Sequence, residues 1–209
     1  MAADIAAWRA AGFSVGADGT AVVGAVRLRF HQPLGAVTGV VGWGLAATEA
    51  DPPSDIEGLP TFAASVPDRA PSDHHPLGAV RVDHIVVLTP DLDHTTATVE
   101  AGLGVALRRR REGPSGSGAH VQQAFFRLGE VILELVAGPP GEPVRFWGLA
   151  FETRSLDAAF ALVGPELLRA PKPAVQPGRR IASFRSGARL GLPVALMDTP
   201  DERPSGPNV

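Results

Sequence analysis

The stretch VDHIVVLTPDLDHTTATVEAGLGVALRRRREGPSGSGAHVQQAFFRLGEVILELVAGP, residues 82–139, decides the fold. It begins with an apolar, β-branched run that ends before Pro90, which is typical of a buried strand. The segment PDLDHTTATVEAGLG follows, with aspartates as cap candidates and glycines at its end, and predicts a helix. A polar strand or edge at VALRRRRE, residues 105–112, and a hairpin around Gly129 come next. The predicted order is one strand, one helix and three strands, or βαβββ.

A shorter, altered copy of this pattern follows it. HIVVLTPDLD from His84 and GLAFETRSLD from Gly148 align without a gap, at an offset of 64 residues. Self-similarity at this period indicates a duplicated supersecondary unit. Two such units would bury their sheet edges and apolar faces by pairing, and their curved sheets would enclose a cavity. The predicted fold class is therefore α+β, with paired βαβββ modules that form a curved mixed-sheet cup.

The composition divides the chain into four parts. Residues 1–50 predict a helix plus strands, with a bulge at Gly24-Ala25, and look like a partial module without its first strand. Residues 51–78 are rich in Pro, Ser and Asp, which predicts a linker or a long covering loop. The two modules are expected over 79–200, at about 81–139 and 144–200, and the tail 201–209 is expected to be disordered.

The paired modules resemble the vicinal oxygen chelate superfamily, the glyoxalase/bleomycin-resistance fold, over about residues 80–200. The DHIVV opening, the LGEVILEL hairpin and the FWGLAFE–SLDAA restart carry the resemblance. Such a fold hosts many activities. In metal-using members the cavity carries up to four ligands, on the first and last strands of each module. The resemblance implies that His84 and Glu134 occupy these positions in the first module.

Strand alternation supports this assignment, because it places His84 with Val86 on one face and Glu134 with Ile132 on one face. A Glu within LELV is costly to bury without a partner, and a His in the same cavity would provide one. In the second module the matching positions are Gly148 and Leu196, so two of the four expected ligands are missing. A third ligand for a divalent metal would have to be Gln122, Gln123 or His120. The alternative is a His–Glu hydrogen bond in a dry or ligand-filled cup. The cofactor is otherwise unknown.

Further side chains are expected to bind the substrate. They are Gln123, Phe125, Phe146, Gly148, Arg180 and Leu196. The run Arg108 to Arg111 would send two of its four side chains toward the cavity if it is a strand. An inward Arg would favour an anionic substrate, such as a carboxylate or phosphonate. The alternative is a solvated strand with an alternating outer face.

The composition narrows the function classes. The chain has 209 residues, a formal net charge of −3 and no cysteine. Bulk attraction to nucleic acid or to an anionic membrane is not expected, and disulfides, thiolate nucleophiles and Cys-bound zinc are excluded. The N-terminus does not resemble a signal peptide, and no apolar run has the length of a membrane span. We expect a cytoplasmic monomer or homodimer whose partner is a small-molecule ligand.

Two functions are compatible with these observations. The first is a small-molecule enzyme of lyase or isomerase type, which abstracts a proton or opens a ring at His84 and Glu134. The alternative is a non-catalytic small-molecule or drug-sequestering protein of bleomycin-resistance type. Affinity for a drug-sized compound without turnover would favour the sequestering protein.

Overall fold

The computed structural model describes residues 1–33, 35, 37–46, 52–67, 75–114, 118 and 120–199. The expected disordered tail, 201–209, lies outside the described residues. Within the described part of the chain, no helix is long and apolar enough to span a membrane.

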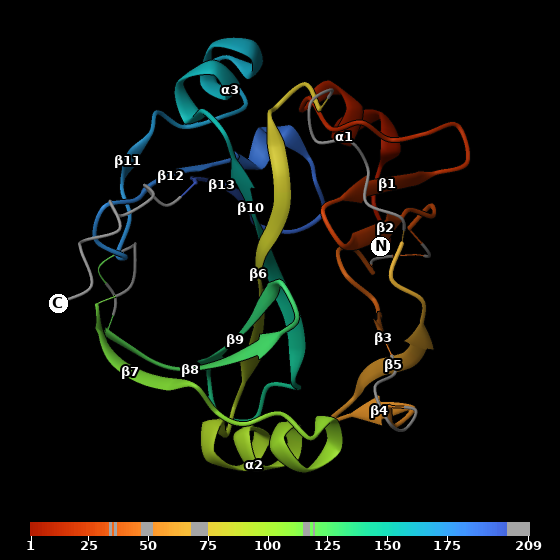
Figure 1. The fold of residues 1–209 in the computed structure, drawn as a ribbon, viewed down its shortest axis with the longest axis vertical. Helices are drawn as coiled ribbons and strands as arrows, with labels where there is room; N and C mark the ends of the chain where they lie inside the picture. The colour runs from red at the N-terminus through yellow and green to blue at the C-terminus, as the bar shows by residue number, and fades with distance from the viewer. Residues whose placement is uncertain are drawn as a thin grey trace, which may run out of the picture.

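One curved sheet of eight strands organises the molecule (Figure 1). From edge to edge its strands are β11 (Lys172–Pro173), β12 (Arg180–Ser183), β13 (Val194–Asp198), β10 (Arg145–Thr153), β6 (Ala79–Thr89), β9 (Val131–Ala137), β8 (His120–Leu128) and β7 (Arg109–Pro114). Each half is one βαβββ module whose first strand lies at the centre of the sheet. The curled sheet confirms the predicted cup of paired modules.

The two modules meet along β6 and β10, which pair antiparallel. His84 pairs with Ala150, and Val86 pairs with Gly148. At the 64-residue offset found in the sequence, His84 corresponds to Gly148 and Val86 corresponds to Ala150. The pair of His84 with Ala150 therefore corresponds to the pair of Gly148 with Val86 when the two modules are exchanged. The modules are therefore related by an approximate twofold axis that passes between the two central strands.

The module helices are α2 (Leu92–Leu103) and α3 (Leu156–Val163). Asp91 Oδ1 accepts a hydrogen bond from the backbone N–H of His94 at the start of α2, and the Ser155 side chain caps α3 in the same way. Gly104 ends α2 with φ 63°, a left-handed conformation that glycine adopts readily. Both helices lie outside the curve of the sheet (Figure 1).

The N-terminal part contains α1 (Ile5–Ala10), β1 (Thr20–Val23), β2 (Val26–Arg29), β3 (Trp43–Ala46), β4 (Asp55–Ile56) and β5 (Leu59–Ala64). The expected bulge at Gly24-Ala25 is instead the turn of the β1–β2 hairpin, where Gly24 has φ 60°. Part of the expected linker forms strands, because β5 pairs with both β3 and β4. Ile56 and Leu59 are buried, so this segment contributes to the core.

The N-terminal part packs against the convex face of the sheet. The rings of Trp8 and Phe13 lie 6.3 and 5.0 Å from the ring of Phe151 on β10. The indole N–H of Trp8 donates to the backbone oxygen of Leu190 at 3.0 Å. Because α1, α2 and α3 also lie outside the curve, none of the described helices covers the concave face (Figure 1).

Candidate functional site

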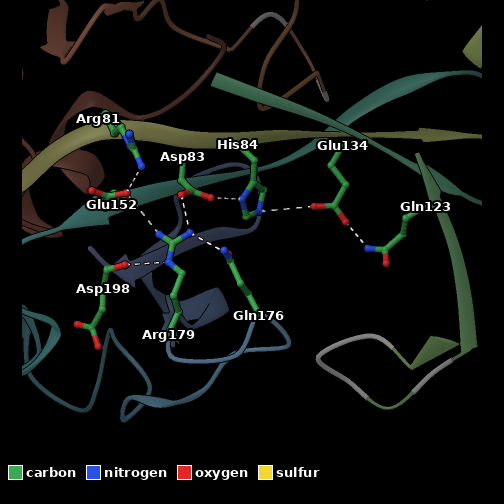
Figure 2. Close-up of polar contacts among 9 residues, drawn as sticks. All are labelled: Arg81, Asp83, His84, Gln123, Glu134, Glu152, Gln176, Arg179 and Asp198. Carbon is green, nitrogen blue, oxygen red and sulfur yellow. Dashed lines mark hydrogen bonds and ion pairs between the residues drawn. The ribbon is translucent and has the colours of Figure 1, made fainter. Parts of the chain in front are cut away.

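A continuous row of polar side chains crosses the concave face. Each member is hydrogen-bonded or ion-paired to the next, and Figure 2 shows the row from Gln123 to Arg179. We call it the polar row; its members are Arg111, Gln123, Glu134, His84, Asp83 and Arg179. They come from β7, β8, β9, β6 and the segment before β12.

The register of the strands explains why His84 and Glu134 share the concave face. Glu134 pairs with Val86, two residues from His84 on β6. Side chains two residues apart on a strand, and those directly opposite one another, lie on the same face. Leu133 and Leu135 alternate to the other face and are fully buried. His84 Nε2 lies 3.8 Å from Glu134 Oε2, so the two form a close pair rather than a direct hydrogen bond.

Asp83 reaches the same face through a β-bulge. Ala150 pairs with His84 and Phe151 pairs with Val82, so Asp83 is an extra residue in β6. A bulge re-aims side chains, and here it places two consecutive residues on one side of the sheet. Asp83 Oδ2 lies 2.8 Å from His84 Nδ1.

Sequence alternation missed Asp83, because it assigns neighbouring residues to opposite faces. The available signal was an acidic residue within an otherwise apolar strand. The second module has the same irregularity at the 64-residue offset, because Trp147 is the extra residue between the pairs of Phe146 and Gly148. The bulge is therefore a feature of both modules.

Arg179 binds the carboxylate oxygen of Asp83 that does not contact His84. Its Nη1 donates to Asp83 Oδ1 at 2.8 Å, and its Nε donates to the backbone oxygen of Asp198 at 2.9 Å. Its Nη2 lies 3.5 Å from Glu152 Oε2, and Glu152 also pairs with Arg81 at 2.5 Å. The Arg179 side chain is only 4% exposed. The carboxylates of Asp83 and Glu152 therefore balance the charges of Arg179 and Arg81 next to His84 (Figure 2).

The surroundings keep Asp83 ionised. Burial alone would raise its pKa, but the hydrogen bond with His84 and the charges of His84 and Arg179 outweigh burial and lower the pKa to about 2. An ionised carboxylate can only accept hydrogen bonds, so His84 Nδ1 carries the proton of the contact. Asp83 thereby fixes the orientation of the ring and directs Nε2 toward Glu134.

Gln123 holds the other side of Glu134. Its Nε2 donates to Glu134 Oε1, while its Oε1 accepts from Arg111 Nη1 at 2.7 Å. Both ends of the amide have a defined partner, so its orientation is set by the network. Glu134 Oε1 is occupied by Gln123, which leaves Oε2 as the oxygen nearer to His84.

The other predicted substrate-binding residues divide into two groups. Phe125 pairs with Glu134 and lies on the concave face. Phe146 packs on Trp43 with ring centroids 5.3 Å apart, and Leu196 is fully buried opposite Phe151, so neither joins the polar row. Arg180 binds Asp157 and Asp198 and lies beside Arg179 rather than beside Glu134.

The register also corrects one correspondence between the modules. Glu134 pairs with Val86, whose counterpart is Ala150, and Ala150 pairs with Ala195. Ala195 rather than Leu196 therefore occupies the second-module position that corresponds to Glu134. The insertion in the second hairpin shifts the sequence alignment by this one residue.

The described residues do not fit a metal held by protein ligands alone. His84 and Glu134 are two donors, and their second-module counterparts, Gly148 and Ala195, have no donor side chain. Gln123 has its oxygen occupied by Arg111. In the ranges that the structure describes, no group of three or more His, Cys, Asp or Glu side chains could hold an ion. A catalytic zinc site ordinarily has three protein ligands, so His84 and Glu134 by themselves would not complete one.

Two hollows adjoin the ends of the polar row. One has a volume of about 600 Å³ and is lined by Arg179, Arg180 and Asp198, among others. The other, of about 590 Å³, lies beside the start of α2 and is lined by Asp93, Arg110 and Glu112 as well as by Arg111 and Gln123. Each hollow thus includes residues of the row, and the pair of His84 and Glu134 lies between these residues.

Comparison with known proteins identified no matching family model and no matching curated protein. Among solved structures, methylmalonyl-CoA epimerase from Mycobacterium tuberculosis is 17% identical with a TM-score of 0.48, and the match covers 58% of this chain and 89% of that chain. A hypothetical protein, BH1468 from Bacillus halodurans C-125, is 17% identical with a TM-score of 0.48, over 61% of this chain and 98% of that chain.

A Streptomyces coelicolor methylmalonyl-CoA epimerase in complex with 2-nitronate-propionyl-CoA is 19% identical, with a TM-score of 0.48, over 59% of this chain and 96% of that chain. The fold itself is defined by the strand order and by the antiparallel pairing of β6 with β10. Residues 79–198 therefore form two paired βαβββ modules, which is the fold that the resemblance to the vicinal oxygen chelate superfamily predicts.

Proposed function

We propose that the protein is a small-molecule enzyme of isomerase or lyase type, in which Glu134 and His84 act as an acid–base pair. The observation that carries this proposal is their geometry on the concave face. Oε2 and Nε2 lie 3.8 Å apart, and the two side chains are 14% and 21% exposed. Both groups can therefore meet a substrate while their other atoms are held by Gln123 and Asp83.

The proposed step is proton transfer at a carbon next to a carbonyl group. The pair starts as a Glu134 carboxylate and a His84 imidazolium, whose charge is countered by Asp83. Glu134 Oε2 takes the proton, and the electron pair of the broken C–H bond enters the enolate. His84 Nε2 then gives its proton to the enolate, and proton transfer from Glu134 to His84 restores the starting state. The step needs no oxidant, reductant or second substrate.

Solvent-deuterium exchange tests this function without knowledge of the natural substrate. A panel of carbonyl compounds is incubated in D₂O, and loss of the proton signal next to the carbonyl is followed by NMR. We expect exchange with the wild-type protein and a decrease of about 10²- to 10⁴-fold in Glu134→Gln and in His84→Gln. Glu112→Gln is the matched control, because Glu112 is an exposed carboxylate on β7 outside the polar row.

A non-catalytic binding protein is the second candidate. It is favoured by the second module, in which Gly148 and Ala195 leave the corresponding positions without a reactive side chain. The same experiment separates the two functions. A compound that binds but exchanges no proton in the wild-type protein, or exchange that is equal in wild type and Glu134→Gln, would favour the binding protein.

A further inference from the structure

The concave face has one half in each module, and we call these halves the first-module limb and the second-module limb. The two limbs differ in charge. On β7, Arg109 pairs with Phe125 and Arg111 pairs with Gln123, which places both arginines on the same face as Glu134. Arg110 alternates to the opposite face and pairs with Asp93. Among the described residues, neither Arg109 nor Arg111 has an acidic partner, so the first-module limb carries uncompensated positive charge.

The second-module limb is small and apolar. Its concave positions are occupied by Gly148, Ala150 and Ala195. Gly148 pairs with Val86, and Ala150 pairs with His84 on one side and with Ala195 on the other. Trp147 is the extra residue of the β10 bulge and is 42% exposed, which is unusual for a large apolar side chain on a central strand. The bulge symmetry places it at the position that Asp83 holds in the first module.

One cross-strand row connects the two limbs. Its pairings run from Arg109 through Phe125, Glu134 and Val86 to Gly148. Neighbouring strands lie about 4.8 Å apart, so the backbones at Arg109 and Glu134 lie about 10 Å apart across the sheet. Phe125 provides an apolar surface between the cation and the carboxylate.

We propose that the substrate is a carboxylate with an apolar body. Arg109 and Arg111 bind the carboxylate, the carbon that loses its proton lies over Glu134, and the apolar body lies over Gly148, Ala195 and Trp147. Guanidinium groups bind carboxylates by charge-assisted hydrogen bonds, and uncompensated arginines facing a cup favour this class of ligand. This assignment rests on the proposed function for the position of the reacting carbon.

A pair of probes that differ only in charge tests the assignment. The first is 4-oxo-4-phenylbutanoate, which has a phenyl body, a carbonyl group and a carboxylate close to the exchangeable carbon. The second is its neutral carboxamide. Binding is measured by titration calorimetry with wild type, Arg109→Gln, Arg111→Gln and Arg110→Gln. The last variant is the matched control, because Arg110 belongs to the same strand but faces away from the cup.

We expect the wild-type protein to bind the carboxylate about tenfold more tightly than the carboxamide, with weaker binding at higher salt. Each inward variant should lose most of this preference, while Arg110→Gln should keep it. Equal binding of the two probes, no binding of the carboxylate at ~1 mM, or an equal loss in all three variants would overturn the proposal.

The outcome is separable from that of the acid–base function. A carboxylate preference without proton exchange would support the arginine site and remove the enzyme proposal. Proton exchange without a carboxylate preference would do the reverse.

Discussion

Asp83 connects the proposed acid–base pair, His84 and Glu134, to the interior of the protein. It accepts a hydrogen bond from His84 on one oxygen and a hydrogen bond from Arg179 on the other, and it is 5% exposed. Because Arg179 is itself buried, Asp83 has little freedom to change its contacts. The orientation of the His84 imidazole is thus set by a residue that does not face Glu134 directly.

The lowered pKa of Asp83 makes a prediction for the acid stability of the protein. Its folded-state pKa of about 2 is below the ordinary value of 3.8, so ionised Asp83 stabilises the folded state above about pH 4. This contribution, about 2 kcal/mol, is lost as the pH falls toward 2. In Asp83→Asn it is absent, so the difference in free energy of unfolding between wild type and variant should shrink over this range.

Urea unfolding at several pH values measures this difference, with Glu112→Gln as an exposed control that should follow the wild type. A difference that stays constant from neutral pH to about pH 2 would contradict a stabilising role for ionised Asp83.

The strands and helices of the two modules follow closely from the sequence, whereas β4 and β5 lie in the expected linker and the polar row was predicted only in part. The repeat at 64 residues and the alternation in β6 and β9 predicted the cup and placed His84 with Glu134. Alternation failed at Asp83, because a bulge is set by the pairing with β10 and not by the strand itself. Leu196 was placed in the cavity because an insertion hid the one-residue shift to Ala195. Arg179 precedes a strand, so its contacts depend on the tertiary fold.

The close approach of two strands at Gly148 leads to a second stability prediction. A Cβ at this position would lie 3.1 Å from the backbone oxygen of Pro193, which is tighter than ordinary contact. Overpacking of this kind costs about 1–3 kcal/mol, whereas replacing glycine with alanine restricts the unfolded chain and gains about 0.4–1 kcal/mol. We therefore expect Gly148→Ala to lower the free energy of unfolding by about 1 kcal/mol.

Gly187 offers the matched control, because its Cβ would meet nothing within 4 Å and its φ is not positive. Gly187→Ala should leave the stability unchanged or raise it slightly. If Gly148→Ala has the same stability effect as the control, then the sheet accommodates a Cβ at this position. The space between Gly148 and Pro193 would then be larger than the 3.1 Å contact indicates.

At the scale of the whole molecule, the N-terminal part is joined to both modules. Trp8 packs near Phe151 of the second module. On the other side, Glu57 in the β4–β5 turn accepts hydrogen bonds from Thr95 and Thr98 of α2, at 2.8 and 2.9 Å. Contacts of this kind, spread over both halves of the sheet, favour one cooperative unit rather than a separate N-terminal domain.

We therefore predict that the chain unfolds in a single transition and that Trp8 stabilises all of it. Trp8 is fully buried, and Trp8→Ala should lower the free energy of unfolding by about 3–5 kcal/mol because it leaves a cavity against β10. Urea unfolding followed by tryptophan fluorescence and by far-UV circular dichroism should give coincident curves in the wild type. Phe62→Ala is the control, since Phe62 is 56% exposed and its loss should change the stability by about 0.5 kcal/mol or less. Two separate transitions, of which only the first responds to Trp8→Ala, would mean that the cup folds independently of the segment that covers its convex face.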